Sequence, residues 1–206
     1  MYIPTHFAEH NLATLHDAIE HYSFATLVSS AAGGMSASHL PLLLDRGSGA
    51  SGTLVGHMAR ANLQWRDAAG QEVLAIFSGP HAYISPQWYE AKEVVPTWNY
   101  VAVHAYGCFE LMNDEAELEA LLARMVQTYE ASQPRPWTFE EPVEFVQRML
   151  RQIVGFRIPI SRLEGKWKLN QNRPEGQREK VVAKLGEKSD ENSREVARLM
   201  EQRERL

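Results

Sequence analysis

The segment from Gly165 to Arg173 gathers the residue types that bind a phosphorylated aromatic ligand. Its two lysines and its arginine can neutralise phosphate oxygens, and its amides can hydrogen-bond phosphate or the edge of a heterocycle. The indole of Trp167 can cover an aromatic ring. Residues 155–173 hold five Lys/Arg and one Glu, a net charge of +4, in a chain whose net charge is −5. Positive charge is therefore concentrated in the same segment that offers amides and an indole to a phosphorylated aromatic ligand.

A second group of polar and aromatic residues, Thr97-Trp98-Asn99-Tyr100, opens a long run of strand-like alternation that extends to Leu111. On a strand, alternate side chains face the same way. Thr97 and Asn99 are therefore expected to face one ligand, while Trp98 and Tyr100 pack elsewhere. The alternative is that these residues only begin a strand and fill the core with their rings.

A third group spans Gly56 to Asn62, between a predicted strand and a predicted helix. The N-terminus of a helix presents unpaired N–H groups and the positive end of the helix dipole, so Arg60 beside it would complete an anion site. The alternative is that Asn62 only caps the helix.

Several other classes of site lack their sequence patterns. The eight histidines form no pair at zinc-like spacing with Cys or acidic partners, so no metal site is expected. GxSxG, GxGxxG and P-loop patterns are absent, which argues against a serine hydrolase, a dinucleotide fold and a P-loop enzyme. The single cysteine excludes an internal disulfide.

Apolar periodicity and glycine-rich turns predict a mainly β fold with helices, an α+β arrangement built on a mostly antiparallel β-barrel. The strands do not alternate regularly with helices, as a parallel sheet would require. The predicted strands cover 24–30, 36–44, 52–58, 72–78, 82–85, 98–111 and 154–161. The predicted helices cover 12–22, 62–69 and 114–129, a stretch that begins near Pro142, and 177–185 and 189–205.

The 206 residues suit one large domain, or one domain with a small appendage. From Pro174 onward the chain has eight Lys/Arg and eight Asp/Glu with thin apolar stripes, which is typical of a solvated helical tail. We therefore expect a domain over 1–173 and a charged tail over 174–206. No apolar run is long enough for a membrane span and no signal-peptide pattern is seen, so a cytoplasmic location is expected.

The charge distribution argues against direct DNA binding. Residues 174–206 are neutral, and residues 1–154 hold eight Lys/Arg against seventeen Asp/Glu, a net charge of −9. Phosphate contacts along nucleic acid require clustered cations. Sequence-specific DNA binding by the chain itself is therefore expected to be weak or absent.

Taken in order, these groups resemble the PaiB-type family of FMN-binding negative transcriptional regulators. Any one of them is a weak match, whereas the series covers nearly the whole chain. The matching segments are Met1-Tyr2-Ile3-Pro4 with His6-Phe7, His39-Leu40-Pro41-Leu42, Gly56-His57-Met58-Ala59-Arg60-Ala61-Asn62, Phe77-Ser78-Gly79-Pro80-His81-Ala82-Tyr83-Ile84-Ser85-Pro86, Val95-Pro96-Thr97-Trp98-Asn99-Tyr100, and 165–173.

The resemblance implies an FMN-binding split barrel that forms a homodimer with flavin at the subunit interface. It implies that Arg60 and Asn62 bind the FMN phosphate together with Lys168. The residues implied to border the flavin ring are Thr97 and Asn99, with His39 and His57, and those implied to complete the pocket from the partner subunit are Lys166, Trp167, Gln171 and Asn172. A regulatory flavoprotein is the first functional hypothesis, and an FMN-dependent oxidoreductase like the pyridoxamine phosphate oxidases or flavin reductases is the alternative.

Overall fold

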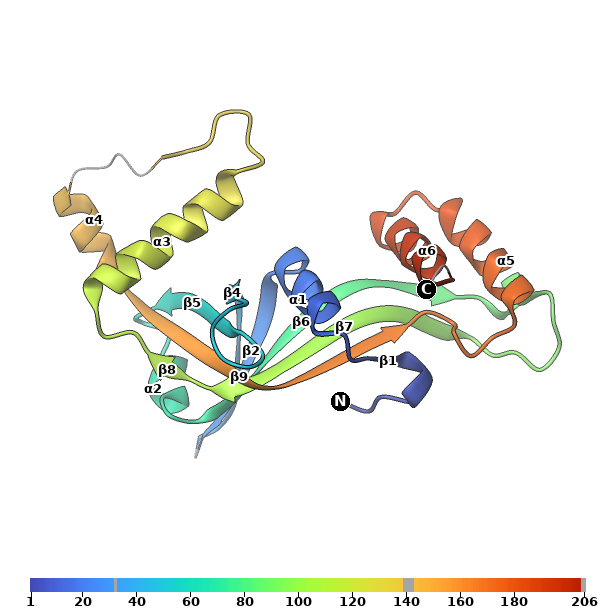
Figure 1. Ribbon diagram of the computed structural model, residues 1–206, viewed down its shortest axis with the longest axis horizontal. Coiled ribbons are helices and arrows are strands. Elements are labelled where there is room, and N and C mark those ends of the chain that lie inside the picture. The colour runs from blue at the N-terminus through green and yellow to red at the C-terminus, as the bar shows by residue number, and fades with distance from the viewer. Residues whose placement is uncertain (32, 139–142, 205–206) are drawn as a thin grey trace. The chain divides into compact units, whose positions relative to one another are not determined.

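The computed structural model describes residues 1–31, 33–138 and 143–204 (Figure 1). The chain divides into two compact units. Unit 1 comprises residues 1–18, 77–104 and 164–206, and unit 2 comprises residues 19–76 and 105–163. The predicted domain boundary at residue 173 falls inside unit 1.

The strands are β1 (Ala8–Glu9), β2 (Phe24–Ala31), β3 (Gly34–Pro41), β4 (Leu43–Asp45), β5 (Thr53–Ala59), β6 (Glu72–Ile84), β7 (Thr97–Cys108), β8 (Glu110–Leu111) and β9 (Ile153–Lys168). They pair in the order β3-β2-β6-β7-β9-β5-β4, and β1 and β8 also pair with β9. The pairs β2 with β3 and β5 with β9 are antiparallel, as are β2 with β6 and β4 with β5. The predicted mainly β, antiparallel fold with helices is confirmed.

The helices are α1 (Leu12–His21), α2 (Gln64–Ala68), α3 (Glu115–Glu130), α4 (Val143–Leu150), α5 (Glu175–Gly186) and α6 (Glu191–Glu204), with short 3-10 turns η1 (Thr5–Phe7) and η2 (Pro86–Tyr89). Each α-helix lies where apolar periodicity predicts one. The start of α4 was predicted near Pro142, which lies outside the described residues. No helix in the described ranges is long and apolar enough to cross a membrane.

Several strand boundaries differ from the prediction, and the predicted strand 98–111 is divided into β7 and β8. The predicted strand 36–44 is broken at Leu42, whose backbone N–H donates to the carbonyl oxygen of Ser23 over 2.9 Å. Strand β6 continues through Gly79-Pro80, where two strands were predicted, because pairing along a sheet can outweigh local turn propensity. Strand β9 extends to Lys168, so the first part of the basic segment belongs to the strand itself.

Unit 2 has a core between its strands and the helices α3 and α4. Asp114 caps α3, since its Oδ1 accepts from the backbone N–H of Ala116 over 2.9 Å. Glu117, in the first turn of α3, forms an ion pair with Arg157 of β9. The buried residues of this core are Leu43, Val55, Leu118, Leu121, Met125, Val146 and Leu150.

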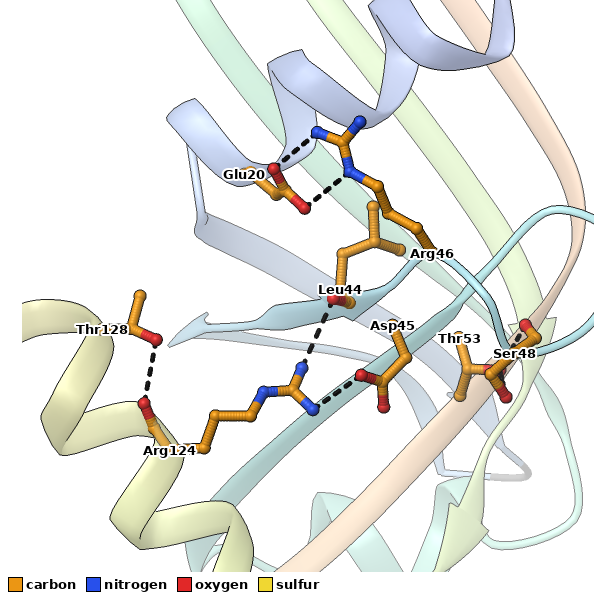
Figure 2. A network of polar contacts seen from close by, with 8 residues as sticks. All are labelled: Glu20, Leu44, Asp45, Arg46, Ser48, Thr53, Arg124 and Thr128. Atoms are coloured by element: carbon orange, nitrogen blue, oxygen red, sulfur yellow. Dashed lines mark hydrogen bonds and ion pairs between the residues drawn. The ribbon is translucent and has the colours of Figure 1, made fainter.

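Polar contacts within unit 2 attach Glu20 and α3 to the β4 region (Figure 2). Arg124 of α3 donates to Oδ1 of Asp45 over 2.6 Å and to the carbonyl oxygen of Leu44 over 3.3 Å. Arg46, which follows β4, forms a two-pronged ion pair with Glu20 of α1. A bidentate arginine contact fixes direction as well as distance.

In unit 1, α5 and α6 pack side by side near the ends of β6 and β7 (Figure 1). The apolar stripes predicted for a solvated tail are core positions. Val181, Leu185 and Val196 are fully buried, and Met200 is 2% exposed. Charge composition alone suggested solvation, but each helix buries one narrow face and leaves its charged residues outside.

Candidate cofactor-binding site

Lys168 and Thr97 meet in unit 1, although they lie 71 residues apart in the chain. Lys168 ends β9 and Thr97 begins β7. The ammonium group of Lys168 donates to Oγ1 of Thr97 and, over 2.8 Å, to the carbonyl oxygen of Trp98. Burial, with a contribution from the neighbouring charge of Lys166, lowers the pKa of Lys168. A partly desolvated cation is therefore held at the entry to the long strand.

Lys166 has a different environment from Lys168. Its side chain is buried, and its ammonium group donates to the carbonyl oxygen of Tyr2 over 3.0 Å. The same ammonium lies 5.1 Å from the centre of the Tyr100 ring and 5.7 Å from that of Tyr2. Cation–π contacts of this kind compensate part of the lost hydration.

Internal hydrogen bonds shape the turn that follows β9. The side chain of Gln171 accepts from the backbone N–H of Leu169 over 2.8 Å and donates to the carbonyl oxygen of Trp167 over 2.6 Å. Asn170 has a left-handed backbone, with φ of 65°, and its amide donates to the hydroxyl of the buried Tyr89 over 3.1 Å. Gln171 thus maintains the turn, whereas the neighbouring Asn172 is exposed.

Helix α6 covers two of the residues predicted to bind the cofactor. Asn99 is fully buried, with its amide nitrogen 3.5 Å from the sulfur of Met200. Its Oδ1 has no hydrogen-bond partner within the described part of the chain. Trp167 is 6% exposed and lies under the guanidinium of Arg203, 5.7 Å from the ring centre. In this chain both side chains belong to the contact with α6.

At the start of β7 the exposed side chain is that of Trp98, which the sequence predicted to pack away from the ligand. Trp98 is 52% exposed, whereas Asn99 beside it is fully buried. The alternation along the strand is as predicted, but the sequence does not say which face a helix covers. Trp98 is thus a candidate ligand residue that sequence reasoning missed, because a large aromatic was assigned to the core by default.

Arg60 in unit 2 is anchored to the backbone that leads into β9. Its Nε donates to the carbonyl oxygen of Arg151 and its Nη2 to that of Ile153, both over 2.8 Å. A pocket of about 200 Å³ adjoins Arg60 at the first turn of α3. Asp114 and Glu115 line this pocket together with Arg60 and Arg151, so its charges nearly cancel. The pocket therefore gives no net preference for phosphate.

The side chain of Asn62 forms two hydrogen bonds within unit 2. Its Oδ1 accepts from the backbone N–H of Gln64 at the start of α2, over 3.1 Å, which is a capping contact. Its amide also donates to Oγ of Ser38 over 2.7 Å. Ser38 lies on β3 beside His39, whose ring nitrogen Nδ1 is 3.0 Å from Oγ1 of Thr26. The structure thus brings Asn62 into contact with the strand that carries His39.

Unit 2 has two polar side chains with buried atoms, His57, which was among the predicted site residues, and Gln64, which was not. Burial lowers the pKa of His57, and its Nδ1 has no hydrogen-bond partner among the described residues. Gln64 is 4% exposed, and its amide donates to the carbonyl oxygens of Leu27 and Ser36 and to Oγ of Ser29. No sequence signal singles out Gln64, because a glutamine after a cap residue is ordinarily exposed.

Comparison with known proteins identifies the family. Residues 1–162 match the family described as "Putative FMN-binding domain". The chain belongs to this family. It is also 37% identical over 204 residues to the protease synthase and sporulation protein PAI 2 of Bacillus subtilis, covering 98% of this chain and 97% of that protein. The predicted membership of the PaiB-type family is confirmed.

Solved structures bear out the fold of this FMN-binding-domain family member. The flavocytochrome Anf3 from Azotobacter vinelandii matches with a TM-score of 0.62 at 15% identity, over 78% of this chain and 69% of that one. The FAD and heme binding protein from Mycobacterium smegmatis matches with a TM-score of 0.53 at 17% identity, over 78% and 73%. The fold is of the FMN-binding split-barrel type, as the sequence resemblance implied.

Proposed function

We propose that the chain binds FMN as a homodimer and acts as a regulatory flavoprotein of the PaiB type. The observation that carries this proposal is the contact between Lys168 and Thr97 in a chain of an FMN-binding-domain family. FMN needs cations for its terminal phosphate and polar and aromatic groups around its tricyclic ring. A lysine already held by a threonine hydroxyl loses little side-chain entropy when it binds an anion.

The residues of both units fit such a ligand to different degrees. The ammonium of Lys168 has three N–H donors, and its two protein contacts leave one for a phosphate oxygen. Asn172 is exposed, and the buried Oδ1 of Asn99 is a hydrogen-bond acceptor without a partner among the described residues. Arg60 and Gln171 already form hydrogen bonds within the chain, so they would also shape the site beside any contact with the ligand.

In this proposal Arg60 and Asn62, with Lys168, bind the phosphate, and Thr97, Asn99, His39 and His57 border the ring. The partner subunit supplies Lys166, Trp167, Gln171 and Asn172. These assignments rest on the resemblance of the sequence segments, and each is a separate target for substitution.

The absorption spectrum of the purified protein tests FMN binding directly. Added FMN should remain with the protein through dialysis, with shifted flavin bands, and riboflavin should bind more weakly because it lacks the phosphate. Lys168→Ala should reduce FMN retention and leave riboflavin binding nearly unchanged. A protein that remains colourless and releases all added FMN on dialysis contradicts the proposal.

The oxidoreductase alternative differs in a measurable property of the same complex. Steady oxidation of NADH or NADPH by the FMN-loaded protein, with turnover on an added acceptor, would assign an enzyme. Slow or absent reduction favours a regulatory flavoprotein. Promoter DNA should bind weakly at most, since residues 1–154 carry a net charge of −9.

A further inference from the structure

Three exposed rings form a continuous strip on β6 and β7 of unit 1. The strip consists of His81, Tyr83 and Trp98. The ring centres of Tyr83 and Trp98 are 5.9 Å apart at an interplanar angle of 70°, and those of His81 and Trp98 are 6.1 Å apart at 39°. Trp98 is 52% exposed and Tyr83 is 46% exposed. Exposed aromatic rings in contact with one another are typical of a binding surface.

The strip has a cationic border. Lys168 is attached to the backbone of Trp98 itself, through the carbonyl oxygen at 2.8 Å. Two residues further along β7, the Tyr100 ring lies 5.1 Å from the ammonium of Lys166. The surface thus offers ring faces and edges beside a positive charge. A planar aromatic ligand that carries an anionic group complements both features.

The opposite face of β7 cannot offer the same surface in this chain. Asn99 lies there under α6, fully buried and next to Met200. A ligand that reaches Lys168 from solvent therefore meets the side of the strand that carries Trp98.

We propose that the isoalloxazine ring of FMN stacks on the exposed indole of Trp98, within the strip that His81, Tyr83 and Trp98 form, and that Lys168 lies at the border of this strip. This inference rests on the proposed function and adds the residues that contact the ring. The Tyr83 ring is inclined at 70° to the indole, so a planar tricycle stacked on Trp98 has Tyr83 beside it at a steep angle. Stacking of a heterocycle on an exposed aromatic side chain contributes measurable affinity without base-specific hydrogen bonds.

The test is a titration of the full-length protein with FMN and with riboflavin, followed by flavin fluorescence. Trp98→Ala and Tyr83→Ala are compared with Trp137→Ala, a matched control because Trp137 is a 46% exposed tryptophan of unit 2. Trp98→Phe keeps an aromatic face and should retain FMN, but it should lose a large part of the quenching of tryptophan fluorescence by bound flavin. Circular dichroism checks that each variant is folded.

Trp98→Ala should weaken FMN and riboflavin alike by about tenfold or more, whereas Trp137→Ala should change neither. A residue that acts on the phosphate, such as Lys168, should instead affect FMN alone. Unchanged flavin affinity of folded Trp98→Ala overturns the inference while the proposed function stands. If that variant dissociates the dimer at unchanged affinity, the strip is a subunit contact and the inference is wrong. Failure of the unaltered protein to bind FMN contradicts the proposed function itself.

Discussion

The ammonium group of Lys168 is shared between the hydroxyl of Thr97 and, over 2.8 Å, the carbonyl oxygen of Trp98. The contact joins the end of β9 to the start of β7. It also removes the ammonium from bulk water, and burial lowers the pKa of Lys168 in the folded chain. The charge that would bind a phosphate is thus more sensitive to alkaline pH than that of an exposed lysine.

FMN affinity should therefore fall at alkaline pH before an ordinary lysine would titrate. The charged form of Lys168 is complete below its lowered pKa and is lost as the pH rises through that value, below 10.5. Lys168→Arg should remain charged throughout this range and should flatten the profile. Fluorescence titration with FMN at a series of pH values measures both curves. Identical curves for the two proteins would show that Lys168 does not bind the phosphate.

Arg60→Ala should lower the free energy of unfolding by about 1–2 kcal/mol, because it removes two hydrogen bonds to the carbonyl oxygens of Arg151 and Ile153. Urea unfolding measures this change. Arg66→Ala is the control, since Arg66 is exposed and its guanidinium lies over the neighbouring Trp65 ring, 5.1 Å from the ring centre. If Arg60→Ala releases FMN at unchanged stability, the guanidinium acts on the ligand more than on the fold.

Asn170→Ala should be less stable than Asn170→Gly by about 1 kcal/mol. Both variants lose the hydrogen bond to Tyr89, but only alanine places a Cβ in the left-handed conformation, at φ of 65°. Thermal unfolding of the two variants isolates the backbone contribution, because the lost side-chain contact is common to them. Equal stabilities would mean that residue 170 does not keep the left-handed backbone conformation in the variants.

Arg203→Ala should destabilise the attachment of α6 by about 1–2 kcal/mol. Arg203 donates to Glu9 over 2.7 Å, and both side chains are mostly buried, at 23% and 15% exposed. Arg198 provides the control, since its ion pair with Glu195 lies within α6 and Arg198 is 51% exposed. Arg198→Ala should cost no more than about 0.5 kcal/mol. Urea unfolding curves of the two variants should separate accordingly.

Gly165→Ala should cost about 1–3 kcal/mol through overpacking. A Cβ at this position would meet the side chain of Leu15, the Trp167 ring at 2.9 Å and Cβ of Glu9 at 3.1 Å. Gly176 in α5 is the control, since a Cβ there meets nothing within 4 Å. Gly176→Ala should raise stability slightly, because alanine favours the helix. Thermal unfolding that shows no difference between the two variants would argue against close packing at Gly165.

The local sequence determined the elements where one periodicity dominates. The stripe of Leu118, Leu121 and Met125 placed α3, and Asp114 marked its start. The alternation from Trp98 onward placed β7. The sequence predicts such segments because apolar periodicity and the capping of unpaired backbone N–H groups involve residues only a few positions apart. The family, too, could be recognised from segments that keep their order along the chain.

Only the tertiary structure decided which face of each element is covered. Asn99 is buried and Trp98 is exposed because α6 packs on one side of β7, and no residue near position 99 reports that helix. The apolar stripes of α5 and α6 looked too thin for a core, yet the sheet and the paired helix supply the missing partners. The tertiary structure also gives the residues of the basic, amide-rich segment 165–173 different roles. Lys168 contacts Thr97, and Gln171 shapes a turn, because contacts across many residues assign each side chain its partner.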